Sequence, residues 1–362
     1  MSTSDVATAV FPWAEHLIQT LPILVLFPHN RCNCRCIMCD IWRLRQVREI
    51  TEDDLQRHLD SLRALKVRWV VLSGGEPLMH SDLGSLCRLL HHESIRITIL
   101  TTGLLLKPYA LFVAENVDDV IVSLDGPSGV HDRIRAVPKA FQKLSDGVKA
   151  LREGRPEIMV AGRCTVQKEN RCCLRATVAA AKELRLNSIS FLAADVTSEA
   201  FNRPEAWTAE QQATIALTAE EVEDLEGEIE ALIRENVDDI ETGVIAENPE
   251  KLRRIVSHFR AHLGQVPFIA PRCNAPWVSS VIEADGTVRP CFFHPSLGNL
   301  IENSLQAILN GEAGTGFRRR LDVSSDPVCQ RCVCSLYLPE DKTEALYRRA
   351  ETVPGLSHVG GE

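Results

Sequence analysis

Between residues 22 and 195, short runs of β-branched residues alternate with amphipathic stretches of helical period. Successive runs lie roughly 24 to 46 residues apart, the spacing of repeated βα units, which form a parallel sheet with right-handed crossovers. Six such units predict an α/β fold built on a partial (β/α)6 barrel, because a closed barrel of this type needs eight. The expected strands are residues 23–27, 69–75, 95–102, 119–126, 158–166 and 188–194. The expected helices lie near residues 52–65, 81–92, 107–116, 138–153 and 171–185.

The sequence changes character after this region. Charged helical segments follow the last expected strand, and the stretch 218–236 is the clearest of them; its acidic face is most simply a solvated surface. After Pro271 come short strands, turns and clustered cysteines. We therefore divide the chain into a barrel, a helical connecting segment, a small C-terminal α+β domain packed against the barrel, and a tail, with expected boundaries at 1–203, 204–265, 266–340 and 341–362.

Composition excludes several classes of protein. The net charge of −9 gives no reason to expect nucleic-acid binding, and no apolar run is long enough for a membrane span. The first residues lack the basic and apolar regions of a signal peptide, so we expect a cytoplasmic location. Thirteen cysteines in that reducing compartment do not indicate a disulfide framework. Metal binding is the better interpretation of those that cluster.

The first cysteine group follows the first expected strand, in the stretch HNRCNCRCIMCDIW. Cys32, Cys36 and Cys39 have the spacing Cys-x3-Cys-x2-Cys, at the end of a strand where reactive groups of α/β folds gather. Iron–sulfur clusters normally take four thiolates, so three would leave one iron free. The alternative is a structural zinc site that uses Cys34 as the fourth ligand, but this loop lacks the paired elements and longer gap typical of zinc sites. Cys34 is therefore expected to take no part.

This loop resembles the cluster loop of the radical S-adenosylmethionine (SAM) superfamily. The resemblance implies that Cys32, Cys36 and Cys39 hold a [4Fe–4S] cluster whose open iron binds the methionine part of SAM. One electron from the cluster would then cleave SAM to a 5′-deoxyadenosyl radical, which abstracts hydrogen from a substrate. Many members carry an aromatic residue just before the third cysteine, where this chain has Met38. The apolar Met38 side chain could still shield the cluster or contact adenine.

A second motif supports the resemblance. Gly74, Gly75, Glu76 and Pro77 follow the second expected strand and match the superfamily element that binds the amino group of SAM. Glycines allow the backbone to approach closely, and a carboxylate or carbonyl acceptor there could hold an ammonium group.

The fourth expected strand ends with a third motif. Ser123 and Asp125 lie on the same side of this strand, so both could face a ribose or carboxylate inside the barrel. Arg135, in the HDRIR segment that recurs in similar enzymes, could pair with a carboxylate. A simple turn and a surface arginine are the alternatives. Further barrel-facing or rim positions without an assigned role are occupied by Thr101, Thr102, Gly103 and Arg163.

The second cysteine group stands near the C-terminus. Cys273 and Cys291, with a glycine five residues before Cys291, resemble the entry half of the SPASM and twitch extensions, and Cys329 and Cys332 would complete four ligands. Only Cys334 follows, so the resemblance implies one auxiliary [4Fe–4S] cluster in a twitch-like domain. Zinc held by the same four thiolates is the alternative.

The implied enzyme is a radical SAM oxidoreductase acting on a small molecule. Its layout is similar to that of the alcohol-oxidising 2-deoxy-scyllo-inosamine dehydrogenase, so an alcohol, sugar or cyclitol substrate is expected, with the auxiliary cluster as electron acceptor. A flavodoxin or ferredoxin would be the reducing partner. The alternatives are a peptide maturase, another tailoring enzyme that forms C–C bonds or epimerises, and a non-catalytic zinc or iron–sulfur scaffold. The sequence selects no general base from Asp195, Glu199, His258, Arg272 and His294.

Overall fold

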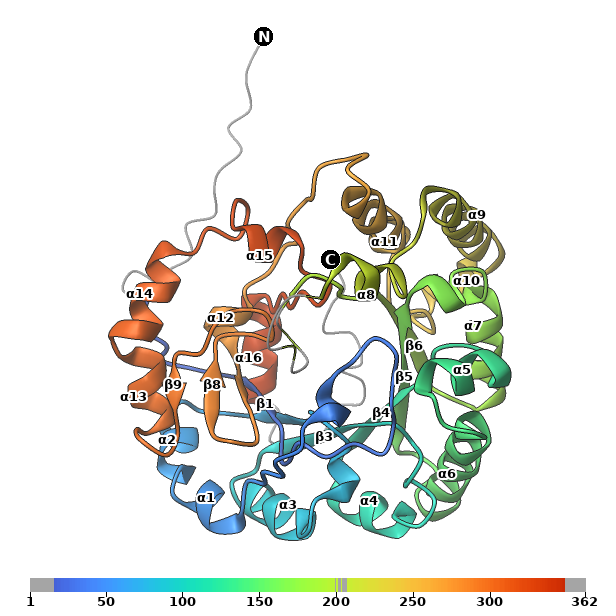
Figure 1. The fold of residues 1–362 in the computed structure, drawn as a ribbon. Helices are drawn as coiled ribbons and strands as arrows, with labels where there is room; N and C mark the ends of the chain where they lie inside the picture. The colour runs from blue at the N-terminus through green and yellow to red at the C-terminus, as the bar shows by residue number, and fades with distance from the viewer. Residues whose placement is uncertain (1–15, 199, 201–202, 204–206, 349–362) are drawn as a thin grey trace.

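The computed structural model describes residues 16–198, 200, 203 and 207–348, and shows a parallel sheet curved into a partial barrel (Figure 1). Six strands follow one another in the order β6-β5-β4-β3-β2-β1, with every neighbouring pair parallel. This arrangement confirms the predicted (β/α)6 architecture. The strands are β1 Ile23–Leu26, β2 Trp69–Leu72, β3 Arg96–Thr101, β4 Asp119–Ser123, β5 Met159–Val166 and β6 Ser188–Ala193.

Helices surround the sheet on its outer side, and their apolar faces share one core with the strands. They are α1 Glu52–Gln56, α2 Leu59–Ala64, α3 Leu83–His92, α4 Ala110–Asn116, α5 Ser128–Arg135, α6 Ala140–Gly154 and α7 Leu174–Glu183. The expected helix at 52–65 breaks in two, because the amide of His58 bonds to Leu55 in a tighter turn. The short helix α5 was not predicted, since its apolar residues are too few to give a clear period.

The C-terminal segment extends the barrel sheet itself. Strand β7 (Ser279–Ile282) pairs in parallel with the outer edge of β1, and the antiparallel strands β8 (Thr287–Arg289) and β9 (Gly298–Asn299) continue from it. A strand edge left open is a site for unwanted pairing, so β7 both covers β1 and fixes the C-terminal segment to the barrel. The helices of this segment are α12 Ala275–Val278, α13 Leu305–Asn310, α14 Glu312–Arg320, α15 Pro327–Gln330 and α16 Glu340–Arg348.

The opposite edge of the sheet, at β6, is covered by the helical segment. Residues 244–246 pair with Ile189, whose amide donates to the carbonyl of Val244 at 2.7 Å. The Glu247 carboxylate accepts the Phe191 amide at 2.9 Å, and burial raises the pKa of this carboxyl to about 7. The segment consists of α8 Ala209–Ala213, α9 Ala219–Glu235, α10 Val237–Glu241 and α11 Pro249–His262.

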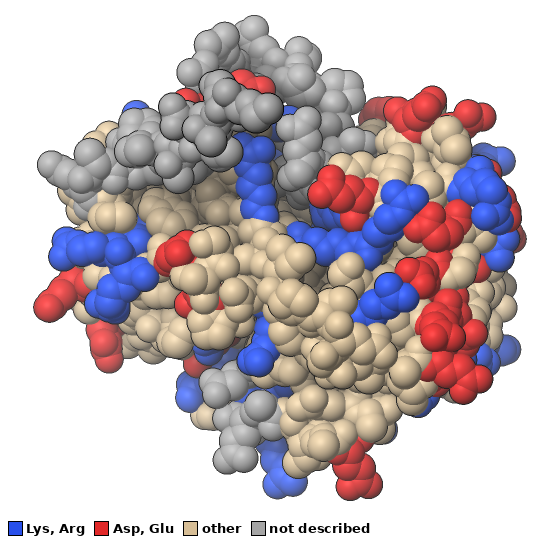
Figure 2. Space-filling model, turned by 90° about the horizontal axis from the view of Figure 1, so that it is seen from above, with Lys and Arg blue, Asp and Glu red and all other residues tan. Residues whose placement is uncertain are grey.

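The acidic surface of α9 is cross-linked by arginines of neighbouring helices. Glu228 pairs with Arg175 at 3.0 Å, and α11 contributes Arg260 to Glu226 at 2.6 Å. Seen from above, acidic side chains gather with interspersed basic ones on the α9 side of the molecule (Figure 2). Among the described helices, none is long and apolar enough to cross a membrane.

Asn274 joins the start of the C-terminal segment to its end. Its side-chain amide donates to the carbonyl of Leu338 at 2.8 Å, while its side-chain oxygen accepts the Leu338 amide at 2.9 Å. The Asn274 backbone amide adds a bond to Leu336 at 2.9 Å. Because Asn274 is 8% exposed, removing its side chain would leave the polar groups of Leu338 unpaired in a buried setting.

We expect Asn274→Ala to lower the free energy of unfolding by about 2 to 4 kcal/mol, because two buried backbone groups lose their partners. Thermal unfolding of anaerobic protein, followed by circular dichroism, measures this loss. Asn303→Ala, at an exposed position, is the matched control and should leave the midpoint unchanged. Equal midpoints for both variants would contradict the structural role of Asn274.

Candidate active site

The first cysteine group lies on the loop between β1 and α1, which crosses the mouth of the barrel (Figure 1). The amide of Cys39 donates to the carbonyl of Cys36 at 3.3 Å, which turns the loop back on itself. The thiols of Cys32, Cys36 and Cys39 are close enough for their charges to interact. Burial raises the pKa of the Cys39 thiol to about 12, so this thiol needs a nearby cation, such as a metal, to ionise at neutral pH. Three converging thiols are a donor set that fits an iron–sulfur cluster.

Cys34 lies within this group, although the sequence predicted no role for it. Its side chain is 1% exposed and hydrogen-bonds with the thiols of Cys32 and Cys36. The hydrogen bond from Cys34 is the largest influence on Cys36, whose pKa is lowered to about 7. No regular spacing distinguishes Cys34 in the sequence, so only the folded loop reveals this contact.

Arg135 places a positive charge beside the cysteines. Its Nη1 lies 3.5 Å from the Cys36 sulfur, while Nε donates to the Asp125 carboxylate at 2.6 Å. Asp125 is fully buried and also accepts the Thr165 amide at 3.0 Å. The pairing predicted for Arg135 therefore occurs within the protein. Asp125 orients Arg135, and Arg135 faces the cysteine loop.

The Gly74–Pro77 motif packs directly against the cysteine loop. A Cβ atom on Gly75 would stand 1.8 Å from the Arg31 carbonyl oxygen, so only glycine fits there. The amide of Glu76 donates to the same carbonyl at 2.8 Å. Gly74 has a φ of +95°, where a side chain would be strained and would also contact Phe27. The glycines were predicted to let the backbone approach a ligand. In the structure they let the backbone approach the cysteine loop.

The carboxylate of Glu76 is occupied by protein donors. It is fully buried and accepts the Thr101 hydroxyl at 2.8 Å, the Thr102 amide at 2.7 Å and the Thr102 hydroxyl at 2.6 Å. Burial raises the pKa of this carboxyl, and these donors oppose the shift. Glu76 thus ties the end of β2 to the end of β3. Pro77 begins the short 3-10 helix η2 (Pro77–Met79), which continues this connection.

A cavity of about 200 Å³ lies inside the mouth of the barrel. Of the residues predicted from sequence, Cys39, Gly74, Ser123 and Arg135 line it, together with Arg163. Its other lining side chains are mostly apolar and come from the barrel and the C-terminal segment: Phe27, Met38, Ile41, Leu100, Leu192, Phe292, Val333 and Cys334. The cavity therefore offers a few polar groups on an apolar wall, as ligand sites commonly do.

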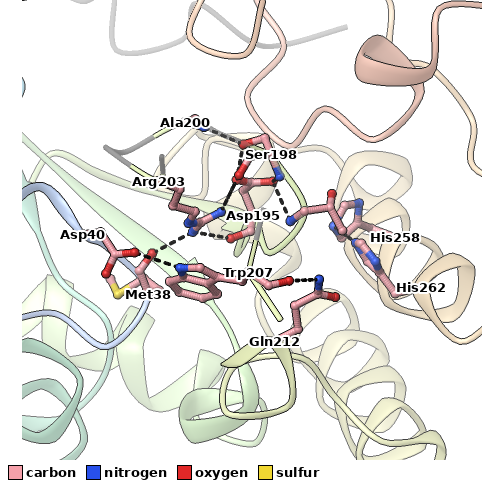
Figure 3. A network of polar contacts seen from close by, with 11 residues as sticks. Met38, Asp40, Asp195, Ser198, Ala200, Arg203, Trp207, Gln212, His258 and His262 are labelled. Atoms are coloured by element: carbon pink, nitrogen blue, oxygen red, sulfur yellow. Dashed lines mark hydrogen bonds and ion pairs between the residues drawn. The ribbon is translucent and has the colours of Figure 1, made fainter. Parts of the chain in front are cut away.

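Residues of the segment after β6 form a network of hydrogen bonds with the cysteine loop (Figure 3). The Arg203 guanidinium donates to the Met38 carbonyl at 3.0 Å and to the Asp195 carboxylate at 2.6 Å. It also stacks on Trp207, 3.9 Å from the ring centre. The Trp207 indole donates in turn to the Asp40 carboxylate at 2.8 Å. Residues on both sides of Cys39 are thus fixed by side chains about 165 positions further along the chain.

This network includes Asp195, one of the residues considered as a general base. Its carboxylate accepts bonds from Arg203, from the Ser198 hydroxyl and from the Ser198 amide at 3.2 Å. Although Asp195 lines the cavity, its carboxyl oxygens are occupied by these donors, which gives it a structural role. His258 contacts His262 at 3.0 Å between their Nε2 atoms, and burial lowers the pKa of His258 to about 3. Glu199 lies outside the described residues.

Arg272 is likewise engaged within the protein. Its guanidinium stacks on Tyr337, 3.7 Å from the ring centre, and donates to the hydroxyl of that residue.

The second cysteine group lies beside the cavity, which Cys334 lines. Cys273, Cys291 and Cys332 each interact electrostatically with Cys334, and Cys329 interacts with Cys273 and Cys291. These thiols fit a second iron–sulfur cluster. Burial raises the pKa of the Cys291 thiol to about 11, so a nearby cation such as a metal ion would favour its thiolate at neutral pH.

One of these thiols also has other neighbours. The Cys329 sulfur lies 3.4 Å from Nε2 of His294, and the ligand atoms of His294, Asp326 and Cys329 lie within 4.8 Å of one another. His294 is therefore placed beside a predicted metal ligand and away from the cavity lining. Cys334, which the sequence left without a role, borders the cavity.

Comparison with known proteins gives two matches to family models. Residues 26–181 match the radical SAM superfamily, and residues 273–333 match SPASM, an iron–sulfur cluster-binding domain. An AdoMet-dependent heme synthase of Methanosarcina barkeri is 30% identical over 158 residues, which are 42% of this chain and 45% of that protein. A probable GTP 3′,8-cyclase of Methanococcus maripaludis is 28% identical over 146 residues, 38% of this chain and 49% of that protein. The matches thus span less than half the length of these relatives.

Solved structures share the fold. Native anSMEcpe with bound AdoMet has a TM-score of 0.62 at 18% identity, covering 86% of each chain. Streptococcus suis SuiB bound to S-adenosylmethionine has a TM-score of 0.60 at 15% identity, covering 90% of this chain and 75% of that one. A radical SAM domain implies a [4Fe–4S] cluster and SAM, and a SPASM domain implies further iron–sulfur binding. The chain therefore contains a radical SAM domain at residues 26–181 and a SPASM iron–sulfur domain at residues 273–333.

Proposed function

We propose that this protein reductively cleaves SAM and uses the resulting radical to abstract hydrogen from a small-molecule substrate in the barrel cavity. Cys32, Cys36 and Cys39 hold the SAM-binding [4Fe–4S] cluster in this proposal. Cys273, Cys291, Cys329 and Cys332 hold one auxiliary cluster. The favoured reaction is oxidation of an alcohol, sugar or cyclitol. We also propose the domain boundaries 1–203, 204–265, 266–340 and 341–362.

A single observation carries this proposal: both cysteine groups border the same cavity. Met38 and Cys39 of the first group line one part of its wall, and Val333 and Cys334 of the second group line another. A substrate in this space would lie between the two clusters. The radical could then be generated on one side and the remaining electron accepted on the other.

The residues around the cavity have separate tasks in the proposal. When bound, the cluster and SAM supply one electron and a 5′-deoxyadenosyl radical. Arg135 neutralises negative charge at Cys36, because Asp125 holds its guanidinium in place. The backbone of Gly74 and the hydroxyl of Ser123 offer polar contacts to the amino-acid part of SAM. The apolar side chains of the wall exclude water, which protects a radical from side reactions.

In alcohol oxidation, the hydrogen atom, the proton and the electron that leave the substrate can all be accounted for. Hydrogen abstraction from the carbinol carbon would leave a substrate radical. Loss of the hydroxyl proton and of one electron would then give the ketone, and Cys273, Cys291, Cys329 and Cys332 would hold the auxiliary cluster that could accept that electron. The names of the relatives, heme synthase and GTP 3′,8-cyclase, support a small-molecule substrate in this proposal.

Peptide modification is the second candidate. SuiB has been solved with its precursor peptide SuiA, and anSMEcpe with the Cp18Cys peptide, and both share the fold of this chain. A screen for deuterium transfer separates the candidates. Alcohols or peptides labelled at one carbon are supplied, and the label is sought in 5′-deoxyadenosine. Transfer from a labelled peptide and from no alcohol would overturn the favoured reaction.

We expect Cys36→Ser to lose the SAM-binding cluster and all formation of 5′-deoxyadenosine. Its iron content should fall by about four atoms per chain, because a [4Fe–4S] cluster with two protein thiolates is not retained. Iron analysis and chromatography of dithionite-reduced reactions measure both effects. Cys172→Ser, at an exposed cysteine, should keep the iron and activity of the natural chain. Unchanged iron in Cys36→Ser would contradict the assignment.

We expect the double change Cys273→Ser/Cys291→Ser to remove about four irons as well, but to leave SAM cleavage by dithionite intact. Ketone formation should be lost, because the substrate radical has no electron acceptor. Zinc analysis of the natural chain provides the decisive comparison. One zinc per chain that is lost in the double variant, with no loss of iron, would identify the second cysteine group as a zinc site.

A further inference from the structure

A second cavity lies inside the barrel, beyond the one at its mouth. It has a volume of about 160 Å³ and reaches the first residues of the strands, such as Met159 of β5. Most of its wall is apolar and comes from β1, β2, β4 and β5. The two cavities adjoin, because five residues line both of them: Ser73, Leu100, Arg163, Phe292 and Cys334. We call them the upper cavity, at the mouth, and the lower cavity.

Arg163 lies where the upper and lower cavities meet, because of the period of strand β5. Alternate residues of a strand point to the same face of the sheet. Met159 and Ala161 line the lower cavity alone, Thr165 lines the upper cavity alone, and Arg163 lines both. Its Nε donates to the hydroxyl of Ser190 on β6 at 3.4 Å. The half-buried Arg163 thus places a positive charge in the middle of the barrel interior.

Arg163 differs from the other charged residues that line the two cavities. Each of the others has an ion-pair partner at 2.6 to 2.8 Å: Arg135 pairs with Asp125, Asp195 with Arg203, and Arg96 with Asp119. Arg163 forms no ion pair within the described part of the chain. Among the residues that the structure describes, it is therefore the one charged group of these walls that no protein group of opposite charge binds.

The carboxyl group of Glu247 interacts electrostatically with Arg163 but is engaged elsewhere. It accepts the Phe191 amide at 2.9 Å, and the Lys251 ammonium lies 4.0 Å away. Because burial raises the pKa of Glu247 to about 7, this group is only partly ionised at neutral pH. Glu247 therefore offsets little of the Arg163 charge. A charged group that is shielded from water without a counter-ion is costly, and a bound anion would reduce that cost.

We propose that Arg163 binds a carboxylate or phosphate group of the substrate, which makes the substrate a small anion with an apolar part. This inference rests on the proposed function and names the class of its substrate. A guanidinium donates two parallel hydrogen bonds to either group, which fixes the orientation of the anion. The apolar part of the substrate occupies the lower cavity, and its hydroxyl-bearing carbon lies in the upper cavity, which Cys39 lines. A neutral sugar or cyclitol would leave Arg163 without a partner.

The test measures binding to the anaerobically reconstituted protein with SAM present, by isothermal titration calorimetry. Three probes share one apolar ring that carries a hydroxyl group: 3-hydroxycyclohexanecarboxylate, its neutral carboxamide and 3-hydroxycyclohexyl phosphate. We expect one of the two anions to bind at least about tenfold more tightly than the carboxamide, because only an anion forms charge-assisted bonds with Arg163. The tighter of the two anions identifies the group that the site recognises.

Variants of Arg163 connect this preference to its side chain. Arg163→Met keeps an unbranched side chain without the charge and should bind anion and carboxamide equally. Arg163→Lys keeps the charge without the planar fork and should retain part of the preference. Arg319→Met, at an exposed position on α14, is the matched control and should keep the preference of the natural chain.

Four results would overturn the role of Arg163. They are equal binding, or absence of binding, of anions and carboxamide in the natural chain; an unchanged preference in Arg163→Met; an equal loss in Arg319→Met; and a loss of SAM affinity in Arg163→Met while the anion preference remains. A separate assay tests the proposed function. If the natural chain forms no 5′-deoxyadenosine with dithionite, the proposed function fails whatever the probes do. If it forms 5′-deoxyadenosine but binds anion and carboxamide equally, only the substrate class fails.

Discussion

The convergence of three thiols on one loop is the constraint on which the site depends. A loop without regular structure cannot hold Cys32, Cys36 and Cys39 together by its own hydrogen bonds, because fixing each residue costs about 1 to 2 kcal/mol of conformational entropy. Neighbouring elements provide the restraint. The Glu76 amide bonds to Arg31, and the amide of Ile37 bonds to the carbonyl of Ile134 at 3.2 Å. Arg203 and Trp207 fix the loop on either side of Cys39.

This constraint changes the interpretation of the conspicuous carboxylates. Glu76 and Asp125 are fully buried and accept hydrogen bonds from protein donors, so these carboxyl groups hold the ends of β3 and α5 against the loop. A carboxylate that accepts several donors is rigid, and a rigid carboxylate positions its partners accurately. Gly74, Ser123 and Arg135 line the cavity, whereas Glu76 and Asp125 do not, and Asp125 holds Arg135 by a hydrogen bond. Each motif thus combines a buried carboxyl group that binds protein donors with a residue that lines the cavity.

Local sequence patterns predicted the strands and the cysteine groups, because each is short and self-contained. The period of β-branched runs identified all six barrel strands, and the spacing of the cysteines marked both metal-binding regions. Long-range pairings could not be predicted in this way. The addition of β7 to β1 and the hydrogen bond from Arg203 to Met38 join distant positions whose relation depends on the folded barrel. The contact of Cys34 with Cys32 is local in the sequence, but it depends on how the loop folds. A buried arginine such as Arg203 looks like any surface arginine in the sequence.

The addition of β7 to β1 also explains why the two cysteine groups can share one cavity. Because β7 lies in the same sheet as β1, the segment carrying Cys291 follows a strand whose register with the barrel is fixed by backbone hydrogen bonds. A domain attached by a flexible linker would allow the two metal sites to drift apart, and electron transfer weakens steeply with separation. Cys39 and Cys334 line the cavity from different segments of the chain. The cavity that the proposed function assigns to the substrate is therefore bordered by the cysteine loop on one part of its wall and by the C-terminal cysteine segment on another.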